Sequence, residues 1–174
     1  MKLVRSIKEA LTHMFDEEYQ FLMNNLNEVK KLDLEEYVFL EEIKDFEIVS
    51  SFKELKYLNI SGTGISDISP FKELKKLEIL YADLCMITDI STLSQLKSLK
   101  ELDLSAPMNY IKSLEPLVHL NNLEKLYVPD HSIKTIEPIY NLNQLKLLSI
   151  ARTEVPNKEI DDFKKKHPNS EVWI

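Results

Sequence analysis

The sequence has only two glycines, a single cysteine and no long apolar run among its 174 residues. The lone Cys85 excludes an intrachain disulfide, which fits a reducing compartment. Gly62 and Gly64 are too few and too close together to form a phosphate-binding loop. No segment approaches the roughly 20 apolar residues that cross a bilayer, and residues 1–9 lack the apolar core of a secretory signal. We therefore expect a cytoplasmic protein that does not enter a membrane.

Positive charge is also in short supply, since 22 Lys and Arg residues stand against 29 Asp and Glu residues, for a net charge of −7. This balance disfavours nucleic acid, whose phosphates require basic side chains, and it favours a protein partner with a basic surface. Catalytic motifs are lacking as well. No Gly-x-Ser-x-Gly occurs, and no histidine has a zinc-site spacing to Cys85. We expect no enzyme, no metal and no cofactor.

An internal repeat is the main feature that is present. Five similar segments open at successive leucines, spaced by 22, 22, 24 and 22 residues: Leu55, Leu77, Leu99, Leu123 and Leu145. Counted from each opening leucine, apolar residues recur at offsets of 3 and 5 in all five segments and at offset 10 in four of them. They recur at offsets 13, 16 and 19 in the first, second and fourth segments, and the third segment carries these later residues two positions late. In the second segment these are Leu80, Ala82, Ile87, Ile90, Leu93 and Leu96. The third segment carries two extra residues within 105–110. Such a period predicts a stacked repeat architecture.

Each segment combines a strand with a turn. The opening Leu-x-x-Leu-x-Leu alternates with period two at its end, which is typical of a strand. Pro70, Pro116 and Pro138 occupy one equivalent position, where a fixed φ and a missing donor indicate a turn. Seven buried side chains contribute about 10–20 kcal/mol. Ordering 22 backbone residues costs roughly 1–2 kcal/mol each. One segment therefore cannot fold alone, and the segments must stack on a shared core.

The pattern Leu99-x-x-Leu102-x-Leu104, followed by Ile111-x-x-Leu114-x-Pro116-Leu117-x-x-Leu120, resembles the 22-residue leucine-rich repeat of bacterial internalins and of phosphatase-regulating members of that family. The resemblance covers roughly Leu34 to the C-terminus. It implies an α/β solenoid, a horseshoe with a parallel β-sheet on the concave face and 3-10 turns on the convex face. Family repeats usually carry Asn at offset 8. Because this chain has instead Thr63, Cys85, His131 and Thr153 there, we expect a looser polar ladder.

Both ends of a solenoid expose apolar cross-sections that need caps. We expect an N-terminal helical cap over 1–33, one degenerate plus five repeats over 34–155, and a C-terminal helix–strand cap over 156–174. The degenerate repeat, 34–54, would place a strand within 34–39. Residues 1–31 fit one long helix or two helices broken near Asp16, with two favoured, which cap the array or bind a partner. Asn157 would cap a helix ending near Lys166, before a final edge strand at 171–174.

Alternate strand side chains point to opposite faces, so offsets 2, 4 and 6 should line the concave surface. Glu36, Val38 and Leu40 would supply this surface in the degenerate repeat. Its centre combines tyrosines with acids, a combination typical of protein interfaces. A hydrolase built on the paired acids would need an enclosing cleft. The candidate partner-binding residues are Tyr57, Asn59, Ile79, Tyr81, Asp83, Glu101, Asp103, Lys125 and Tyr127.

The functional hypothesis is a non-catalytic protein-binding module that uses its concave sheet. A free-standing inhibitor is one such role, for example an immunity protein that neutralises a basic toxin. The alternatives are a scaffold or regulatory subunit, similar to phosphatase-associated relatives, and an adhesin-like surface fragment, similar to internalins. The insertion around Met108, Asn109 and Tyr110 either lengthens a loop at the rim of this face or is a neutral irregularity.

Overall fold

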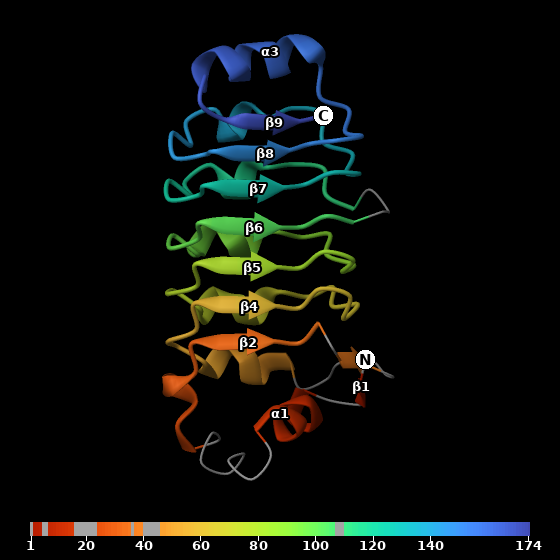
Figure 1. The fold of residues 1–174 in the computed structure, drawn as a ribbon, viewed down its shortest axis with the longest axis vertical. Helices are drawn as coiled ribbons and strands as arrows, with labels where there is room; N and C mark the ends of the chain where they lie inside the picture. Colours follow the sequence, from red (N-terminus) through yellow and green to blue (C-terminus); the bar gives the residue numbers. More distant parts are fainter. Residues whose placement is uncertain (1, 5–6, 16–23, 36, 40–45, 107–109) are drawn as a thin grey trace.

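The computed structural model describes residues 2–4, 7–15, 24–35, 37–39, 46–106 and 110–174 (Figure 1). The short strands of its main sheet are stacked along the long axis and run in one direction. Seven strands form this parallel sheet, in the order β2-β4-β5-β6-β7-β8-β9. Their bounds are β2 Lys31–Asp33, β4 Tyr57–Asn59, β5 Ile79–Tyr81, β6 Glu101–Asp103, β7 Lys125–Tyr127, β8 Leu147–Ser149 and β9 Glu171–Trp173. The predicted parallel sheet of a solenoid is thus confirmed.

The register of this sheet follows the repeat. Adjacent strands place equivalent leucines side by side, namely Leu58, Leu80, Leu102, Leu126 and Leu148. Each strand is three residues long, and backbone hydrogen bonds on either side extend the ladder, as from the Ala82 amide to the Asp103 carbonyl at 2.9 Å. The side-chain alternation that the sequence predicts therefore has the same phase in every coil.

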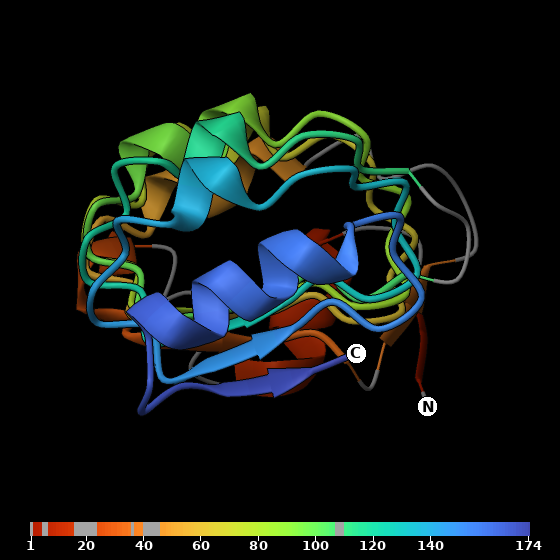
Figure 2. The ribbon, with the colours of Figure 1, turned by 90° about the horizontal axis from the view of Figure 1, so that it is seen from above.

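A row of 3-10 turns forms the opposite, convex side of the solenoid (Figure 2). The turns are η3 Phe46–Ser51, η4 Ser69–Glu73, η5 Ser91–Gln95, η6 Glu115–Leu117 and η7 Glu137–Ile139. A short polar side chain at one repeat position accepts the amide two residues later. Asp67 and Asp89 do so at 2.8 Å for Ser69 and Ser91. This local bond competes with helix and sheet pairing and so favours a turn at the same point of each coil.

The core runs unbroken between the sheet and the turns. The residues at the repeating apolar offsets are 8% exposed or less, and most are fully buried. In the second coil, Leu80 from the strand and Leu93 from the turn both have no exposed surface. Burying such a side chain contributes about 1.5–3 kcal/mol. Every coil needs its neighbours for this burial, which is why the array folds together.

The predicted polar ladder at offset 8 is also present. Thr63 Oγ1 and Cys85 Sγ both donate to the carbonyl of Ile60, at 2.6 and 3.1 Å. His131 Nε2 contacts the carbonyl of Leu104 at 2.7 Å, and its Nδ1 accepts the amide of Ile111 at 3.3 Å. Because Nδ1 accepts, the imidazole is neutral with its proton on Nε2. Burial lowers the pKa of His131, which stabilises this neutral form.

The first coil differs from the prediction. The first strand of the sheet is Lys31–Asp33, which pairs with Tyr57–Asn59, and not a strand within 34–39. The strand β3 (Tyr37–Phe39) instead pairs with β1 (Lys2–Val4) in a separate parallel pair. The assignment of Glu36, Val38 and Leu40 to the concave surface is therefore wrong in register, and residues 36 and 40 lie outside the described residues. The first two strands of the sheet are further apart in the sequence than the later ones. Two overlapping apolar patterns, which begin at Val29 and at Leu34, therefore both fit a strand in this coil.

At the N-terminus, α1 (Ile7–Phe15) buries Ala10 and Leu11. The predicted helical start at residues 2–4 is wrong, because these residues form β1. Most of the second predicted helix, 16–23, lies outside the described residues, and it is followed by the 3-10 turn η2 (Leu26–Glu28). No helix among the described residues is both long enough and apolar enough to span a bilayer.

The C-terminal cap matches its prediction closely. Helix α3 (Asn157–Lys166) buries Ile160 and Phe163, and β9 then joins the edge of the sheet beside β8. The helix lies across the end of the solenoid (Figure 2). One detail is wrong: Asn157 is the first helical residue, and Pro156 occupies the N-cap position. Proline suits a helix start because it has no amide hydrogen to leave unpaired.

Candidate functional site

The outward positions of the sheet form a concave face with an acidic excess. It carries six carboxylates, from Asp33, Glu35, Asp83, Glu101, Asp103 and Glu171, against two lysines, Lys31 and Lys125. The local net charge of −4 therefore makes up over half of the chain's −7. The core contains none of these side chains, because it is formed by the alternate residues of each strand, which point inward. Their types are free to serve another purpose.

Side chains of two neighbouring outward rows contact one another before any partner binds. Tyr57, Glu101 and Lys125 belong to the first row, and Tyr81 belongs to the second. Lys31 Nζ lies 4.6 Å from the centroid of the Tyr57 ring, and the rings of Tyr57 and Tyr81 meet edge to face at 5.7 Å. Tyr81 donates to Glu101 at 2.8 Å, and Lys125 donates to the same carboxylate at 3.0 Å. Burial and the bond to Glu101 raise the pKa of Tyr81, so its hydroxyl remains a donor. This order reduces the entropy that binding would cost.

Ile79 stands beside Tyr57 in the first outward row, and its apolar side chain is half-buried. It faces Glu101 across the β5–β6 pair. Ile79 therefore places an apolar side chain next to the carboxylate that Tyr81 and Lys125 hold. Such mixed patches are common at protein interfaces.

The concave face is hollowed next to these side chains. A cavity of about 300 Å³ is lined by residues of the first five strands of the sheet and the turns that follow them. The lining consists of Glu35, Asn59, Ser61, Tyr81, Asp83, Glu101, Asp103 and Tyr127. We call this cavity the acidic hollow. Four of its eight lining residues are carboxylates and none is basic, so it suits a cationic group and repels an anion.

Asp103 is the central carboxylate of the acidic hollow. It lies between Tyr81 and Tyr127 in the register of the sheet. Its Oδ1 accepts the Ser105 amide at 2.8 Å and the Ser105 hydroxyl at 2.6 Å, whereas its Oδ2 accepts no bond from the described residues. Burial raises the pKa of Asp103, and the nearby charges of Asp83 and Glu101 raise it further. A bound cation would relieve both effects.

Two buried polar residues form the base of the acidic hollow. Asn59, 3% exposed, accepts the Ser61 amide at 3.0 Å and donates to Glu35 at 2.9 Å. Its amide therefore holds Glu35 in place. Ser61 is 6% exposed, and its Oγ has no hydrogen-bond partner among the described residues. Leaving such a group unpaired costs about 1–3 kcal/mol, so a ligand group that bonded to this hydroxyl would remove that cost.

The structure adds residues to the face that the sequence prediction missed. Lys31, Asp33 and Glu35 come from the first coil, where Val29-x-x-Leu32-x-Leu34 repeats the spacing of the later strands. This signal was present and was absorbed into a helical pattern. At the other end, Trp173 meets Tyr127 edge to face at 6.1 Å and donates to Glu171 at 2.7 Å. The final strand therefore extends the concave face, in addition to capping it.

Leu84 and Met86 form an exposed apolar rim next to the acidic hollow. They are 60% and 52% exposed, and Leu84 directly follows Asp83. Leu84 also has φ +56°, a left-handed conformation that the preceding coil gives to Gly62, at φ +70°. A leucine there costs roughly 1–2 kcal/mol relative to an unstrained residue. The sequence predicts that the insertion around Met108, Asn109 and Tyr110 either lengthens a loop at the rim of the concave face or is neutral, and of these residues 108 and 109 lie outside the described residues.

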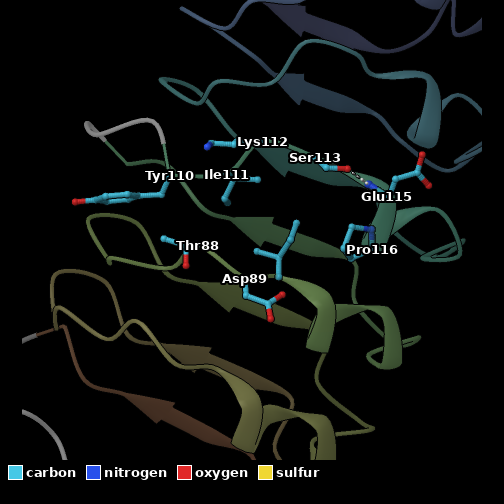
Figure 3. Close-up of a pocket in the computed structure, with 9 residues that line it drawn as sticks. Thr88, Asp89, Tyr110, Ile111, Lys112, Ser113, Glu115 and Pro116 are labelled. Atoms are coloured by element: carbon cyan, nitrogen blue, oxygen red, sulfur yellow. Dashed lines mark hydrogen bonds between the residues drawn. The ribbon is translucent and has the colours of Figure 1, made fainter.

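A second hollow, of about 720 Å³, lies between the coils around that insertion (Figure 3). It is lined by Tyr110, Lys112 and Glu115 of one coil and by Thr88 and Asp89 of the coil before. The two extra residues of the third repeat lie within 105–110, so the hollow borders the insertion. Its charges are mixed, and the Asp89 carboxylate is used in capping the turn at Ser91. The acidic hollow is the better candidate site.

Among the residues that the structure describes, no three His, Cys, Asp or Glu side chains are placed to hold a metal ion. Cys85 is buried next to Thr63, and burial raises its pKa, so its thiol is not an activated nucleophile. What the concave face can do chemically is to accept hydrogen bonds and cations.

Comparison with known proteins identifies the same repeat. A sequence model of leucine-rich repeats in two copies matches residues 53–94. No curated protein sequence matches the chain. Among solved structures, internalin C2 of Listeria monocytogenes is similar, with a TM-score of 0.74 and 23% identity over 98% of this chain and 75% of that one.

Two further structures show the same likeness. An internalin F of Listeria monocytogenes has a TM-score of 0.69 and 24% identity, over 96% of this chain and 54% of that one. A leucine-rich-repeat protein of Leptospira interrogans has a TM-score of 0.74 and 21% identity, over 100% of this chain and 49% of that one. The chain thus spans about half the length of these two. By its repeats and by its fold, the chain is a leucine-rich-repeat protein.

Proposed function

We propose that this chain binds another protein on its concave sheet. Leucine-rich-repeat proteins are in general binding modules without catalysis, and solenoid concavities are large enough to hold a folded partner. The observation that carries the proposal is the ordered chain of contacts from Lys31 through Tyr57, Tyr81 and Glu101 to Lys125. These side chains point away from the core and are not part of it. Fixed aromatic and charged residues usually contribute most of the binding energy at an interface.

The partner should present a basic surface. Six carboxylates against two lysines give the concave face a potential that attracts cations. Attraction of this kind steers association, and salt screens it over about 8–10 Å. Association should therefore slow roughly tenfold or more as ionic strength rises from about 0.05 to about 0.5 M. An association rate that is independent of salt would contradict the basic partner.

Within this function we propose a cytoplasmic, free-standing inhibitor of a basic protein, as an immunity protein neutralises a toxin. The acidic face supports it, since proteins that act on nucleic acid are themselves basic. The buried free thiol of Cys85 is compatible with a reducing compartment. The competing roles are a regulatory subunit of an enzyme such as a phosphatase and an adhesin-like surface protein. A toxin gene beside this one would favour the inhibitor, and a signal peptide upstream would favour the adhesin.

Site-specific photo-crosslinking tests the concave site while the partner is still unidentified. A benzophenone side chain replaces Ile79 or Leu147 on the concave face, or Lys72 on the convex turn η4 as the matched control. Each variant is irradiated in an extract of the host, and crosslinked proteins are identified by mass spectrometry. The proposal expects one shared product from both concave positions and none from Lys72. The same product from Lys72, or different products from the two concave positions, would overturn it.

A further inference from the structure

We propose that the acidic hollow is a receptor for one arginine side chain of the partner protein. This inference rests on the proposed function, and it names the chemical group that the concave face recognises. Four carboxylates and no basic residue line the hollow, so its occupant must be cationic. The neighbouring Lys125 is held at the rim by Glu101 at 3.0 Å.

The positions of the two tyrosines favour a flat cation. Tyr81, Asp103 and Tyr127 are in register on three neighbouring strands, with the carboxylate in the middle. Strands are about 4.8 Å apart, so the two tyrosine positions are separated by about 10 Å. A guanidinium that enters between these positions can stack its flat face on one of the two rings, whereas a lysine ammonium has no flat face.

The acceptors also match a guanidinium better than an ammonium. The Oδ2 of Asp103 and both carboxylate oxygens of Asp83 accept no hydrogen bond from the described residues, although both side chains line the hollow. An arginine has five N–H donors in a planar fork, which suits two carboxylates that approach from different directions. These open acceptors are the ones that a bidentate cation requires.

Ser61 supplies an independent observation. It is only 6% exposed and lines the same hollow, yet its hydroxyl has no partner among the described residues. A buried polar group without a partner is unusual in native proteins and calls for an explanation. A donor that enters the hollow gives this hydroxyl its missing hydrogen bond. The charge and the open hydroxyl therefore point to the same occupant.

The test uses the whole protein and two small probes, N-acetyl-arginine methylamide and N-acetyl-lysine methylamide. NMR titration should give the arginine probe a Kd on the order of 1 mM, as expected for so small a ligand. The lysine probe should bind roughly tenfold more weakly. This comparison needs no variant, so it does not depend on any mutant folding. Equal affinity for the two probes, or no binding of the arginine probe at about 50 mM, would overturn the proposal.

Three variants locate the binding. Asp103→Asn removes one charge and keeps the shape of the side chain, and it should weaken the arginine probe roughly tenfold. Ser61→Ala should weaken it about threefold. Glu115→Gln is the matched control, because it removes one charge from the exposed convex turn η6. The control should leave the affinity unchanged. Equal weakening by Asp103→Asn and Glu115→Gln would show attraction by net charge alone and would refute the site.

The two proposals fail in different ways. Concave crosslinks together with probes that do not bind would refute the arginine receptor and leave the protein-binding face intact. A bound arginine probe together with crosslinks from Lys72 would place the partner elsewhere, and the receptor would then lose its assigned role.

Discussion

Acid should destabilise this protein through His131, and the structure sets the size of the effect. The imidazole is 1% exposed and bridges two backbone groups, the carbonyl of Leu104 and the amide of Ile111. Protonation at Nδ1 would turn an acceptor into a donor that faces the Ile111 amide, and it would bury a charge. Burial accordingly lowers the pKa of His131 below its usual 6.5.

The sign follows from where the proton binds. Between pH 6.5 and the lowered native pKa, the unfolded chain holds a proton on this histidine and the folded chain does not. Falling pH therefore favours unfolding, by up to about 1.4 kcal/mol per pH unit. From about pH 7.5 to about pH 5.0 the loss from this group is at most about 2 kcal/mol. Stability from this residue is complete above pH 6.5 and is lost as the pH falls.

Urea unfolding, followed by circular dichroism at about pH 7.5, 6.5, 5.5 and 5.0, measures the effect. His131→Asn is the informative variant, because an amide also offers one acceptor and one donor but does not titrate. Other titrating groups are common to both proteins, so the difference between their pH profiles belongs to His131. His131→Ala should cost about 2–5 kcal/mol at every pH, since both backbone partners become unpaired. An equal acid loss in the wild type and in His131→Asn would refute the assignment.

Three shorter predictions follow from burial, backbone strain and charge. Leu102→Ala, at a fully buried position of the central strand, should cost about 3–5 kcal/mol in urea unfolding, and a loss below about 1 kcal/mol would contradict the shared core. Leu84→Gly should raise stability by about 0.5–1 kcal/mol in thermal unfolding, because it relieves a left-handed leucine. Asp103→Asn should raise the urea midpoint at about pH 7, since a raised carboxyl pKa means that the ionised form disfavours folding; a lower midpoint would contradict this.

The fold could be predicted from the sequence because every coil after the first repeats the same spacing of apolar residues. Leu58 and its equivalents recur at fixed spacing, and this spacing alone places them side by side. The first coil was not readable in the same way. Val29 and Leu34 each begin an acceptable strand pattern, and only the packing against Tyr57–Asn59 selects the first. The spacing of about 22 residues favoured the wrong one.

The candidate site was predictable in outline and not in detail. Alternation along the strands places Tyr81, Asp103 and Tyr127 on one face, as the register confirms. It does not tell which polar atoms find partners. Asn59 uses both ends of its amide within the protein, whereas the hydroxyl of Ser61, two residues later, has none among the described residues. Such differences depend on distances between coils, which a linear pattern does not contain.

Two departures from local stability lie in the coils that begin at Leu55 and Leu99. They are the hydroxyl of Ser61, which is unpaired among the described residues, and the raised pKa of Asp103. The left-handed φ of Leu84 recurs at the equivalent Asp130 and Arg152 and therefore belongs to the repeat. Strain and unpaired polar groups concentrate where a protein binds its ligand. The core does not cause these departures, because the inward columns of the same coils are fully packed. A paired hydroxyl at position 61 and a neutral side chain at position 103 would make the fold more stable. Both residues line the acidic hollow, where a bound cationic donor would supply the missing hydrogen bond and the missing positive charge.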